Sequence, residues 1–288
     1  MNKNIIIFTD LDGTLLDSKY SFEKAKPALK LIKKKKIPLI LCSSKTKTEI
    51  EYYRKKLKNT HPFISENGGG IFIPKKYFNF KISSIRDTYL SKTGFHIEDQ
   101  KKYIVIQLSN IYPELRKAIK DFRKNGLNVL GFGDMSIKEV SNLTGLKSSE
   151  AKMSKQRDFD EPFVFKGNKN SMIRLKQLIK SKALTYTQGE FYHLMGNSDK
   201  GRAVELLKKL YVKQKGEIIT IALGDNPNDR EMLKSVDHPV IVRKPDGTYC
   251  KNIRIKKLIR TAGTGPSGWN SAVTKLLVRY GTESESCQ

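Results

Sequence analysis

Short apolar runs, separated by helical patterns, recur at both ends of this chain of 288 residues. Ile5 to Thr9 and Ile37 to Cys42 are such runs, and Ile218 to Leu223 repeats the pattern far along the chain. Unbroken apolar runs of this length are typical of strands buried on both faces of a parallel sheet. Helical spacing follows the first two runs, over Glu23 to Lys35 and Thr46 to Lys58. Strands that alternate with helices predict β–α units and therefore an α/β fold.

The middle of the chain has a different pattern. Strand-like runs at Tyr103 to Leu108 and Phe163 to Phe165 are mixed with an amphipathic helix over Pro113 to Asn125, and a hairpin is expected around Gly189. This mixture favours a separate α+β module inserted into the first domain. We therefore expect residues 1–84 and 189–288 to form a catalytic core and residues 85–188 to form a cap domain.

The first apolar run ends in the segment Asp10 to Thr14, which places Asp10 and Asp12 two residues apart at the end of a buried strand. In open α/β sheets that edge is where ligands bind. One carboxylate can attack a phosphorus atom, while the other holds a proton for the leaving oxygen. Gly13 allows the backbone to turn sharply between them. An Asx-rich turn is the structural alternative, but the strand context favours chemistry.

A second acidic segment, Gly224 to Asp229, follows the apolar run Ile218 to Leu223. It supplies Asp225 and Asp229. Mg²⁺ is typically bound by one or two carboxylates, waters and a substrate phosphate. A role for Asp229 near the N-cap of the following helix is the structural alternative, but that role does not account for Asp225. The segment therefore predicts a Mg²⁺ site.

Two further segments carry groups suited to phosphate. Ser43 and Ser44 follow the run Ile37 to Cys42 and precede a predicted helix, where hydroxyl and backbone N–H groups can hold an anion. Lys200 opens another predicted helix and can neutralise charge on a phosphoryl group. Each signal is weak alone, because serines also cap helices and most lysines are solvated.

In this order along the chain, the four segments resemble the four motifs of the haloacid dehalogenase superfamily, and a cap inserted between the second and third motifs adds to the resemblance. The resemblance implies a Rossmann-like core. It implies that Asp10 is a nucleophile that becomes an aspartyl phosphate and that Asp12 is the general acid. It also implies that Ser43 hydrogen-bonds the phosphoryl group.

The same resemblance implies a complete metal and phosphate site. Mg²⁺ would be held by Asp10, by the backbone carbonyl of Asp12 and by Asp225, and Lys200 would balance the phosphoryl charge. Asp229 would act through water or by orienting Lys200. Simple electrostatics agrees, because a dianionic phosphate approaches a carboxylate only when cations screen the repulsion.

Further segments stand out at Ser65 to Gly70, at Arg157 and Asp160 to Phe163, at His193 to Asn197 and at Gly263 to Asn270. As a set, they are similar to a narrower group of that superfamily, the mannosyl-3-phosphoglycerate phosphatases. Their substrate carries a carboxylate, a phosphate and a sugar. Gly-rich turns bind anions through backbone N–H groups, arginine can hold a carboxylate through two hydrogen bonds, and Glu and His can bond sugar hydroxyls. Turns and ordinary packing are the structural alternatives. The candidate substrate-binding residues are Asn67, Gly68, Gly69, Arg157, Glu161, His193, Thr264 and Gly265.

Other functions stay open at this point. The same chemistry can serve a glucosyl-3-phosphoglycerate, a sucrose phosphate or another sugar phosphate, because the cap decides the substrate. A phosphomannomutase-like enzyme would share the nucleophile but retain the phosphoryl group. A non-catalytic anion or nucleic-acid binder is the alternative from another class, and the carboxylates argue against it since they would repel a nucleic-acid backbone.

The formal net charge is +26, which attracts anions in general. The excess is spread along the chain and no nucleic-acid module is recognisable. We therefore expect a small phosphorylated metabolite as the partner, and neither nucleic acid nor a membrane, since no apolar run approaches the ~20 residues that span a bilayer. The dispersed cysteines, Cys42, Cys250 and Cys287, favour a reducing cytoplasm without disulfides. The sequence leaves the oligomeric state open.

Overall fold

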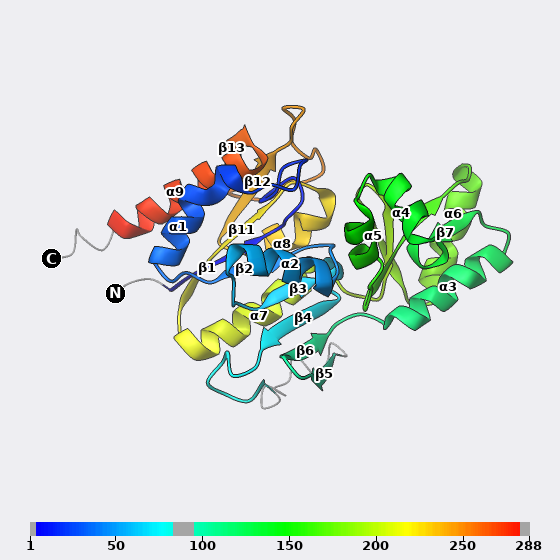
Figure 1. The fold of residues 1–288 in the computed structure, drawn as a ribbon, viewed down its shortest axis with the longest axis horizontal. Coiled ribbons are helices and arrows are strands. Elements are labelled where there is room, and N and C mark those ends of the chain that lie inside the picture. The colour runs from blue at the N-terminus through cyan, green and yellow to red at the C-terminus, as the bar shows by residue number, and fades with distance from the viewer. Residues whose placement is uncertain (1–3, 83–94, 283–288) are drawn as a thin grey trace.

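The computed structural model of the protein describes residues 4–82 and 95–282. These residues form two sheets with helices packed on them, and the two parts lie side by side (Figure 1). The larger sheet has nine strands and the smaller has four. The expected α/β core with an inserted α+β cap is therefore confirmed.

The larger sheet has the strand order β13-β12-β11-β1-β2-β3-β4-β6-β5. Neighbouring strands from β13 to β3 are parallel, whereas β3, β4, β6 and β5 pair in antiparallel fashion. The strands are β1 (Asn4–Thr9), β2 (Leu39–Cys42), β3 (Phe63–Ser65), β4 (Gly70–Pro74), β5 (His96–Asp99), β6 (Tyr103–Gln107), β11 (Ile218–Gly224), β12 (His238–Arg243) and β13 (Ile259–Thr264).

Helices cover both faces of this sheet, as the continuous apolar strands require. Ile7 points into one buried cluster with α1 (Lys26–Lys34), α2 (Lys47–Leu57) and α9 (Gly265–Thr282). Its neighbour Ile6 points into the other cluster, which holds α7 (Lys200–Lys215) and α8 (Arg230–Lys234). Successive strand residues face opposite sides, and both faces of β1 are therefore buried.

The chain reverses its winding direction between β1 and β11. It runs from β1 to β2 on one side, and from β11 to β12 on the other, while β1 and β11 pair directly. Such a switch point opens a crevice at the carboxyl ends of the two strands. Asp10 follows β1 and Asp225 follows β11 at this crevice, and the fold therefore brings residues more than 200 positions apart to one edge.

The smaller sheet has the order β7-β8-β10-β9 and is antiparallel. Apolar side chains on one face pack with α3 and α6 around Phe163 and Leu194. The elements are α3 (Tyr112–Lys124), β7 (Val129–Gly131), α4 (Ile137–Thr144), α5 (Ser148–Ser154), β8 (Asp160–Phe165), α6 (Lys169–Ser181), β9 (Thr185–Gln188) and β10 (Tyr192–Met195). The hairpin expected around Gly189 is formed by β9 and β10.

The assignment of strands to the two sheets does not follow the expected cap limits of residues 85–188. β5 and β6 pair in the larger sheet, whereas β10 pairs in the smaller one. The two crossings between the domains are adjacent, because Gly196 N–H donates to Ser109 Oγ at 2.8 Å. The expected limit at residue 85 lies outside the described residues. We propose that the cap comprises residues 109–196, because β6 ends just before and β10 just within these limits. The sequence predicted other limits, since an apolar strand does not reveal which of two sheets it joins.

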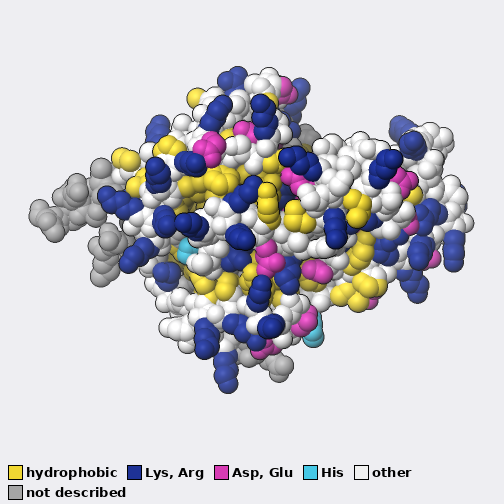
Figure 2. All heavy atoms as spheres, viewed as in Figure 1, with side chains coloured by type: hydrophobic (Ala, Val, Ile, Leu, Met, Phe, Trp, Pro, Cys, Tyr) yellow, Lys and Arg dark blue, Asp and Glu magenta, His cyan; other side chains and the backbone are white. Residues whose placement is uncertain are grey.

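The basic side chains on one face of the molecule are dispersed. Figure 2 shows Lys and Arg side chains scattered over the visible face of both domains. Within residues 4–82 and 95–282, no helix has the length and apolarity to cross a bilayer.

Candidate active site

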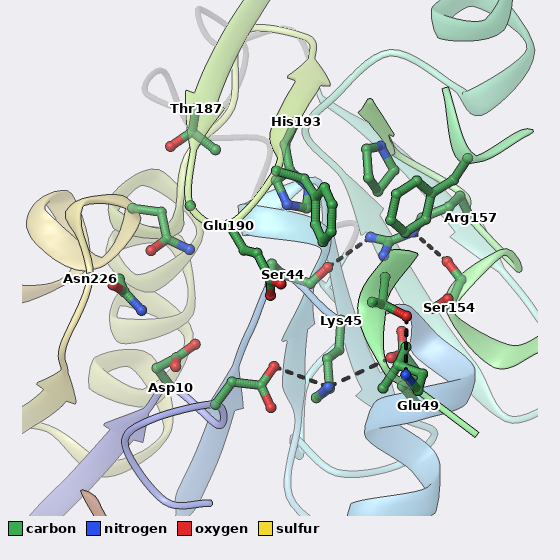
Figure 3. Close-up of a pocket in the computed structure, with 18 of the residues that line it drawn as sticks. Asp10, Ser44, Lys45, Glu49, Ser154, Arg157, Thr187, Glu190, His193 and Asn226 are labelled. Atoms are coloured by element: carbon green, nitrogen blue, oxygen red, sulfur yellow. Dashed lines mark hydrogen bonds and ion pairs between the residues drawn. The ribbon is translucent and has the colours of Figure 1, made fainter. Parts of the chain in front are cut away.

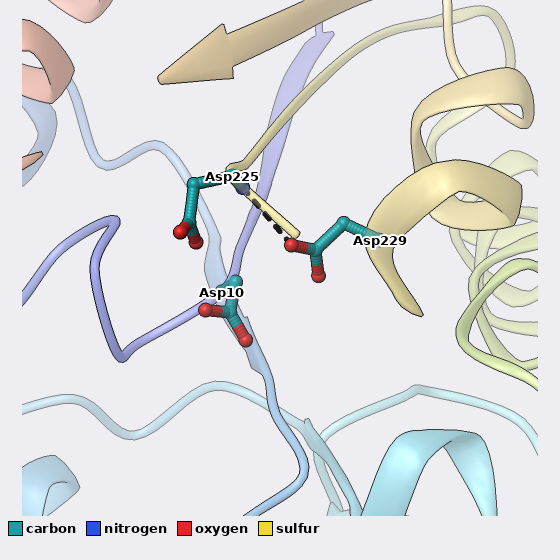
Figure 4. Close-up of side chains that lie close together, drawn as sticks. All are labelled: Asp10, Asp225 and Asp229. Atoms are coloured by element: carbon teal, nitrogen blue, oxygen red, sulfur yellow. Dashed lines mark hydrogen bonds between the residues drawn. The ribbon is translucent and has the colours of Figure 1, made fainter. Parts of the chain in front are cut away.

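Three buried carboxylates meet at the switch point. Oxygen atoms of Asp10, Asp225 and Asp229 lie within 4.8 Å of one another (Figure 4). Asp10 stands directly after β1, and its backbone N–H donates to the carbonyl of Leu223 in β11 at 2.9 Å. The ladder between the two central strands therefore holds the candidate nucleophile.

Lys200 is the cation of this cluster. Its Nζ donates to Asp10 Oδ1 at 2.7 Å and to Asp229 Oδ1 at 2.6 Å, and the residue is 1% exposed. It begins α7, which is capped by Asp199 through a bond from Arg202 N–H. Burial alone would lower the pKa of Lys200, but Asp10 and Asp229 outweigh burial and raise it. Lys200 is therefore charged across the physiological range.

Asp229 is fully engaged within the protein. One oxygen accepts from Lys200, and the other accepts the backbone N–H groups of Asp225 and Asn226, each at 3.0 Å. A carboxylate with both oxygens occupied is a poor direct metal ligand. The geometry favours Asp229 as the group that orients Lys200 and shapes the loop after β11.

Asp225 retains an oxygen for a ligand. Thr14 Oγ donates to Asp225 Oδ1 at 2.9 Å, and within the part of the chain that the structure describes no donor bonds Oδ2. Gly13 has a φ of +74°, and a Cβ there would lie 2.7 Å from Asp225 Oδ2. Glycine is thus needed for the backbone conformation and for close approach.

The electrostatics of the cluster suit a bound cation. Burial and the neighbouring Asp229 raise the pKa of Asp225 to about 7. Burial also raises the pKa of Asp10 well above its usual range, although Lys200 opposes this. Crowded, buried carboxylates with oxygen atoms to spare resist ionisation unless a cation balances them. Mg²⁺ prefers oxygen ligands of this kind, so Asp10 and Asp225 fit the group that the sequence predicts.

Asp12 lies at the rim of the site, apart from the buried cluster. Its side chain is 44% exposed, and Lys45 Nζ lies 3.0 Å from its Oδ2. Glu49 Oε1 is 3.7 Å from the same nitrogen, and the ring of Tyr20 packs beneath it at 4.9 Å. Because Lys45 is nearly buried, it holds the carboxylate of Asp12 in one place. A charged partner at the candidate general acid is a feature that we did not expect from sequence.

The two serines of the second motif have different positions. Ser43 is fully buried, its Oγ accepts from Lys45 N–H at 3.3 Å, and its N–H donates to the carbonyl of Ile64. Ser44 is partly exposed and lines the pocket. The helix that follows begins with Thr46 as N-cap, in a capping box with Glu49. The predicted helix start after the serines is confirmed.

A pocket opens between the core and the cap above these residues (Figure 3). The cap is joined to the core at this place, since Thr46 Oγ1 donates to the carbonyl of Met153 in α5 at 3.1 Å. The hairpin of β9 and β10 forms part of the pocket wall. The polar side chains that line it are Asp10, Asp12, Tyr20, Ser44, Lys45, Glu49, Thr144, Ser154, Arg157, Thr187, Glu190, His193, Asn226 and Asn228.

Two of the predicted substrate residues, Arg157 and His193, line this pocket. Both contact the buried carboxylate of Asp160: Arg157 Nη1 lies 2.8 Å from Oδ1, and His193 Nδ1 lies 2.9 Å from Oδ2. Arg157 also donates to the carbonyls of Ser44 and Ser154. The Arg157 side chain is 5% exposed. Its burial and these hydrogen bonds hold it in one position at the pocket surface.

Other predicted residues are not brought to the pocket. Glu161 lies on the opposite face of β8, where its carboxylate accepts from Arg116 at 2.8 Å and from Gly133 N–H at 2.9 Å. The alternation of strand side chains explains why Asp160 and Glu161 face opposite sides. A Cβ at Gly68 would lie 2.1 Å from the carbonyl oxygen of Asp199, and one at Gly69 would lie 2.4 Å from Phe159 Cβ. These glycines permit close packing.

Asn67, Thr264 and Gly265 lie around the site without lining the pocket. Asn67 is buried and bridges Asn228 and Asp160 by hydrogen bonds of 3.0 Å each. Thr264 ends β13, and Gly265 begins α9 with a φ of +48°, beside the carbonyl of Gly13.

The sequence by itself predicted no role for several residues of the site. Lys45, Asp160, Glu190, Asn228 and Thr14 all contact the pocket or the predicted residues. Lys45 and Asn228 lie inside the recognised motifs, and their position there is a signal by which a role at the site could have been predicted. Asp160 and Glu190 lie in the cap, where their roles depend on strand pairing.

Comparison with known proteins identifies the family. The sequence matches the haloacid dehalogenase-like hydrolases over residues 7–247. A glucosyl-3-phosphoglycerate/mannosyl-3-phosphoglycerate phosphatase from Methanococcoides burtonii is 44% identical over 275 residues, covering 94% of this chain and 97% of that protein. A mannosyl-3-phosphoglycerate phosphatase from Pyrococcus furiosus is 36% identical over 242 residues, covering 82% and 90%.

A solved structure leads to the same fold. A phosphatase of the haloalkanoate superfamily from Bacteroides thetaiotaomicron has a TM-score of 0.63 to this chain at 14% identity, covering 97% of this chain and 96% of that one. The family match spans most of the chain and includes the first, second and fourth motifs as well as Lys200. The chain therefore belongs to the haloacid dehalogenase-like hydrolases.

Proposed function

We propose that the protein is a Mg²⁺-dependent phosphomonoesterase that hydrolyses mannosyl-3-phosphoglycerate to mannosylglycerate and phosphate. The observation that carries this proposal is the arrangement of Asp10, Lys200 and Asp225 at the switch point, below a pocket that Asp12 borders. It combines a nucleophile, a buried cation, spare oxygen ligands and a second carboxylate in one place. The names of the relatives support the substrate.

In the first step, a carboxylate oxygen of Asp10 attacks the phosphorus atom. The new O–P bond forms as the bond from phosphorus to the C3 oxygen of the glycerate breaks, and Asp12 donates a proton to that leaving oxygen. Lys200, held by Asp229, balances the negative charge of the phosphoryl group. The products of this step are the free alcohol and an aspartyl phosphate on Asp10.

In the second step, water replaces the alcohol. Asp12, now ionised, takes a proton from the water as its oxygen attacks phosphorus, and the bond to Asp10 breaks to release phosphate. Lys45 Nζ lies 3.0 Å from Asp12 Oδ2 and keeps the Asp12 side chain oriented at the pocket rim; the two form an ion pair once the proton of Asp12 has gone to the leaving oxygen. When bound, Mg²⁺ would be held by Asp10, Asp225 and the Asp12 carbonyl, and it would screen the repulsion between phosphate and carboxylate.

The cap side of the pocket supports a substrate larger than a plain phosphate ester. Arg157 and His193 lie there together with Glu190 and Thr187 from the β9–β10 hairpin. Carboxylate and hydroxyl side chains suit sugar hydroxyls, and a rigidly held guanidinium suits the glycerate carboxylate. Both mannosyl and glucosyl compounds are in the names of relatives, and glucosyl-3-phosphoglycerate is therefore the first alternative substrate.

The test is phosphate release from mannosyl-3-phosphoglycerate, beside glucosyl-3-phosphoglycerate, sucrose 6-phosphate and plain sugar phosphates, with Mg²⁺ and with EDTA. We expect fast release from the mannosyl compound that stops with EDTA. Release from other compounds alone would reassign the substrate, while transfer of phosphate within a sugar phosphate would indicate a mutase. No release from any compound by folded protein would contradict the proposal.

Asp10→Asn tests the nucleophile itself. The amide retains an acceptor for Lys200 and removes one of three crowded carboxyl groups, so the protein should fold with an unchanged or higher melting temperature. Turnover should fall by at least about 10³-fold, since the amide cannot form the covalent intermediate. A variant that retains near-normal turnover would exclude Asp10 as the nucleophile.

A further inference from the structure

A chain of buried polar contacts links the catalytic loop to the cap. Asn228, in the loop that carries Asp225 and Asp229, donates to Asn67 Oδ1 at 3.0 Å. Asn67 donates in turn to Asp160 Oδ2 at 3.0 Å. Asp160 is fully buried and contacts both Arg157 and His193. One carboxylate thus connects two pocket residues of the cap to the loop that holds the candidate metal ligand.

The backbone that carries Asn67 is held in an unusual conformation. Glu66 and Asn67 have φ values of +49° and +56°, and Gly68 follows at +91°. Two consecutive non-glycine residues in the left-handed region cost free energy, and such strain persists where the surroundings enforce it. Here Glu66 accepts the backbone N–H groups of Asp158, Phe159 and Asp160 at 2.7–3.1 Å. The strained segment is therefore hydrogen-bonded to the start of β8, and this places Asn67 within hydrogen-bonding distance of Asp160.

Asp160 determines which atoms of its two partners are left for a ligand. Burial alone would raise the pKa of Asp160, but Arg157 and His193 outweigh it and lower the pKa. An ionised carboxylate only accepts hydrogen bonds, so Nδ1 of His193 carries the proton and Nε2 is left for a ligand. Arg157 uses Nη1 for Asp160 and for the carbonyl of Ser44, and Nε for Ser154. No described residue accepts from Arg157 Nη2.

We propose that Asp160 is a positioning residue that sets the substrate class: it fixes Arg157 so that Nη2 binds the carboxylate of the glycerate unit, and His193 so that Nε2 bonds a neighbouring hydroxyl. This inference rests on the proposed function for the identity of the substrate. The contact from Asp160 through Asn67 to Asn228 ties this recognition to the catalytic loop, so that a carboxylate-bearing substrate is held in register with Asp10.

The test compares two anions that differ mainly in the carboxylate. 3-Phosphoglycerate and glycerol 3-phosphate are each measured as inhibitors of p-nitrophenyl phosphate hydrolysis with Mg²⁺, and by calorimetry, which needs no turnover. In the wild type we expect 3-phosphoglycerate to bind ~10- to ~100-fold more tightly. In Asp160→Asn this ratio should fall to within about threefold of one, because the neutral amide no longer fixes the guanidinium.

Two further variants separate positioning from general damage. Glu161→Gln removes the adjacent buried carboxylate on the opposite face of β8 and should leave the ratio at its wild-type value. Arg157→Lys retains the positive charge beside Asp160 but has no second nitrogen to donate into the pocket. Its preference for 3-phosphoglycerate over glycerol 3-phosphate should therefore disappear, as in Asp160→Asn. If Asp160→Asn does not fold, Arg157→Lys still tests the proposal.

The outcomes are distinct. A wild-type ratio near one would overturn the inference even if the protein is a phosphatase. A wild-type ratio that persists in both Asp160→Asn and Arg157→Lys, with both anions weakened equally, would also overturn it and leave Asp160 a structural role. A carboxylate preference that depends on Asp160, without hydrolysis of any glycosyl-3-phosphoglycerate, would support the inference while contradicting the substrate named under the proposed function.

Discussion

At the scale of single residues, the site depends on how charges are distributed around Lys200. Both carboxylate oxygens of Asp229 accept hydrogen bonds from protein donors, whereas in Asp225 and in Asp10 only one oxygen does so among the described residues. The three carboxylates are therefore not equivalent, although all are buried within the same cluster. Asp229 supports the arrangement, and the other two have oxygens with which to bind a cation.

Asp225→Asn should raise the Mg²⁺ requirement without unfolding the protein. The amide can still accept from Thr14, but it lacks the charge that attracts a dication, so the Mg²⁺ concentration for half-maximal activity should rise about tenfold or more. A Mg²⁺ titration of turnover measures this shift. Asp246→Asn, which alters an exposed carboxylate, should respond as the wild type does. An identical response in Asp225→Asn would remove Asp225 from the metal site.

At the scale of elements, the segment Glu66–Gly68 determines how the cap joins the core. It follows β3 at the same edge as the catalytic loops, and it binds the backbone at the start of β8. Burial, together with the nearby Asp160, raises the pKa of Glu66 to about 8. The folded protein therefore retains a proton on Glu66 at a pH where the unfolded chain has lost it.

This proton makes stability depend on pH. A carboxyl whose pKa is raised on folding stabilises the protein fully below its unfolded pKa, and this contribution is lost as pH rises through the folded value. From about pH 4.5 to about pH 8, the wild type should lose stability relative to Glu66→Gln, by at most about 1.4 kcal/mol per pH unit. Urea unfolding of both proteins at pH 5, 6.5 and 8 measures the difference. A gap that widens in favour of the wild type at high pH would contradict the prediction.

At the scale of the whole molecule, the formal charge of +26 exceeds what the site requires. On the face drawn in Figure 2, the basic side chains are spread over both domains. Unbalanced like charges repel one another and destabilise the compact state, while they also raise the local concentration of anionic substrates. The charge is therefore a property of stability and encounter, and it does not define the fold.

Screening should stabilise this protein. From 10 to 150 mM NaCl the Debye length falls from about 30 Å to about 8 Å, so repulsion weakens and the melting temperature should rise, by about 2–4 °C for each kcal/mol gained. Thermal unfolding at each salt concentration, monitored by circular dichroism, measures the melting temperature. The double variant Lys30→Glu and Lys120→Glu lowers the net charge from +26 to +22, since each reversal removes two units, and should show a smaller rise. A fall with salt in the wild type would contradict this account.

Much of the fold and of the core site was predictable from local patterns. Buried strands ended by acidic segments have few ways to be arranged, because a parallel sheet gathers the ends of its strands at one edge. The positions of Asp10 and Asp225 follow from that rule, and the family match confirms the fold class that it implies. Local pattern also placed the hairpin of β9 and β10 and the capped start of α2.

The remaining assignments depended on contacts between distant residues. Nothing local shows that β6 joins the larger sheet or β10 the smaller, because pairing is a choice between partners far away in sequence. The same holds for Asp160 and Glu161, neighbours that β8 turns to opposite faces. The ion pair of Asp12 with Lys45 also forms across a distance that no motif spans. Residue chemistry and spacing determine the reaction that the core can support, whereas strand register and domain packing determine which side chains reach the substrate.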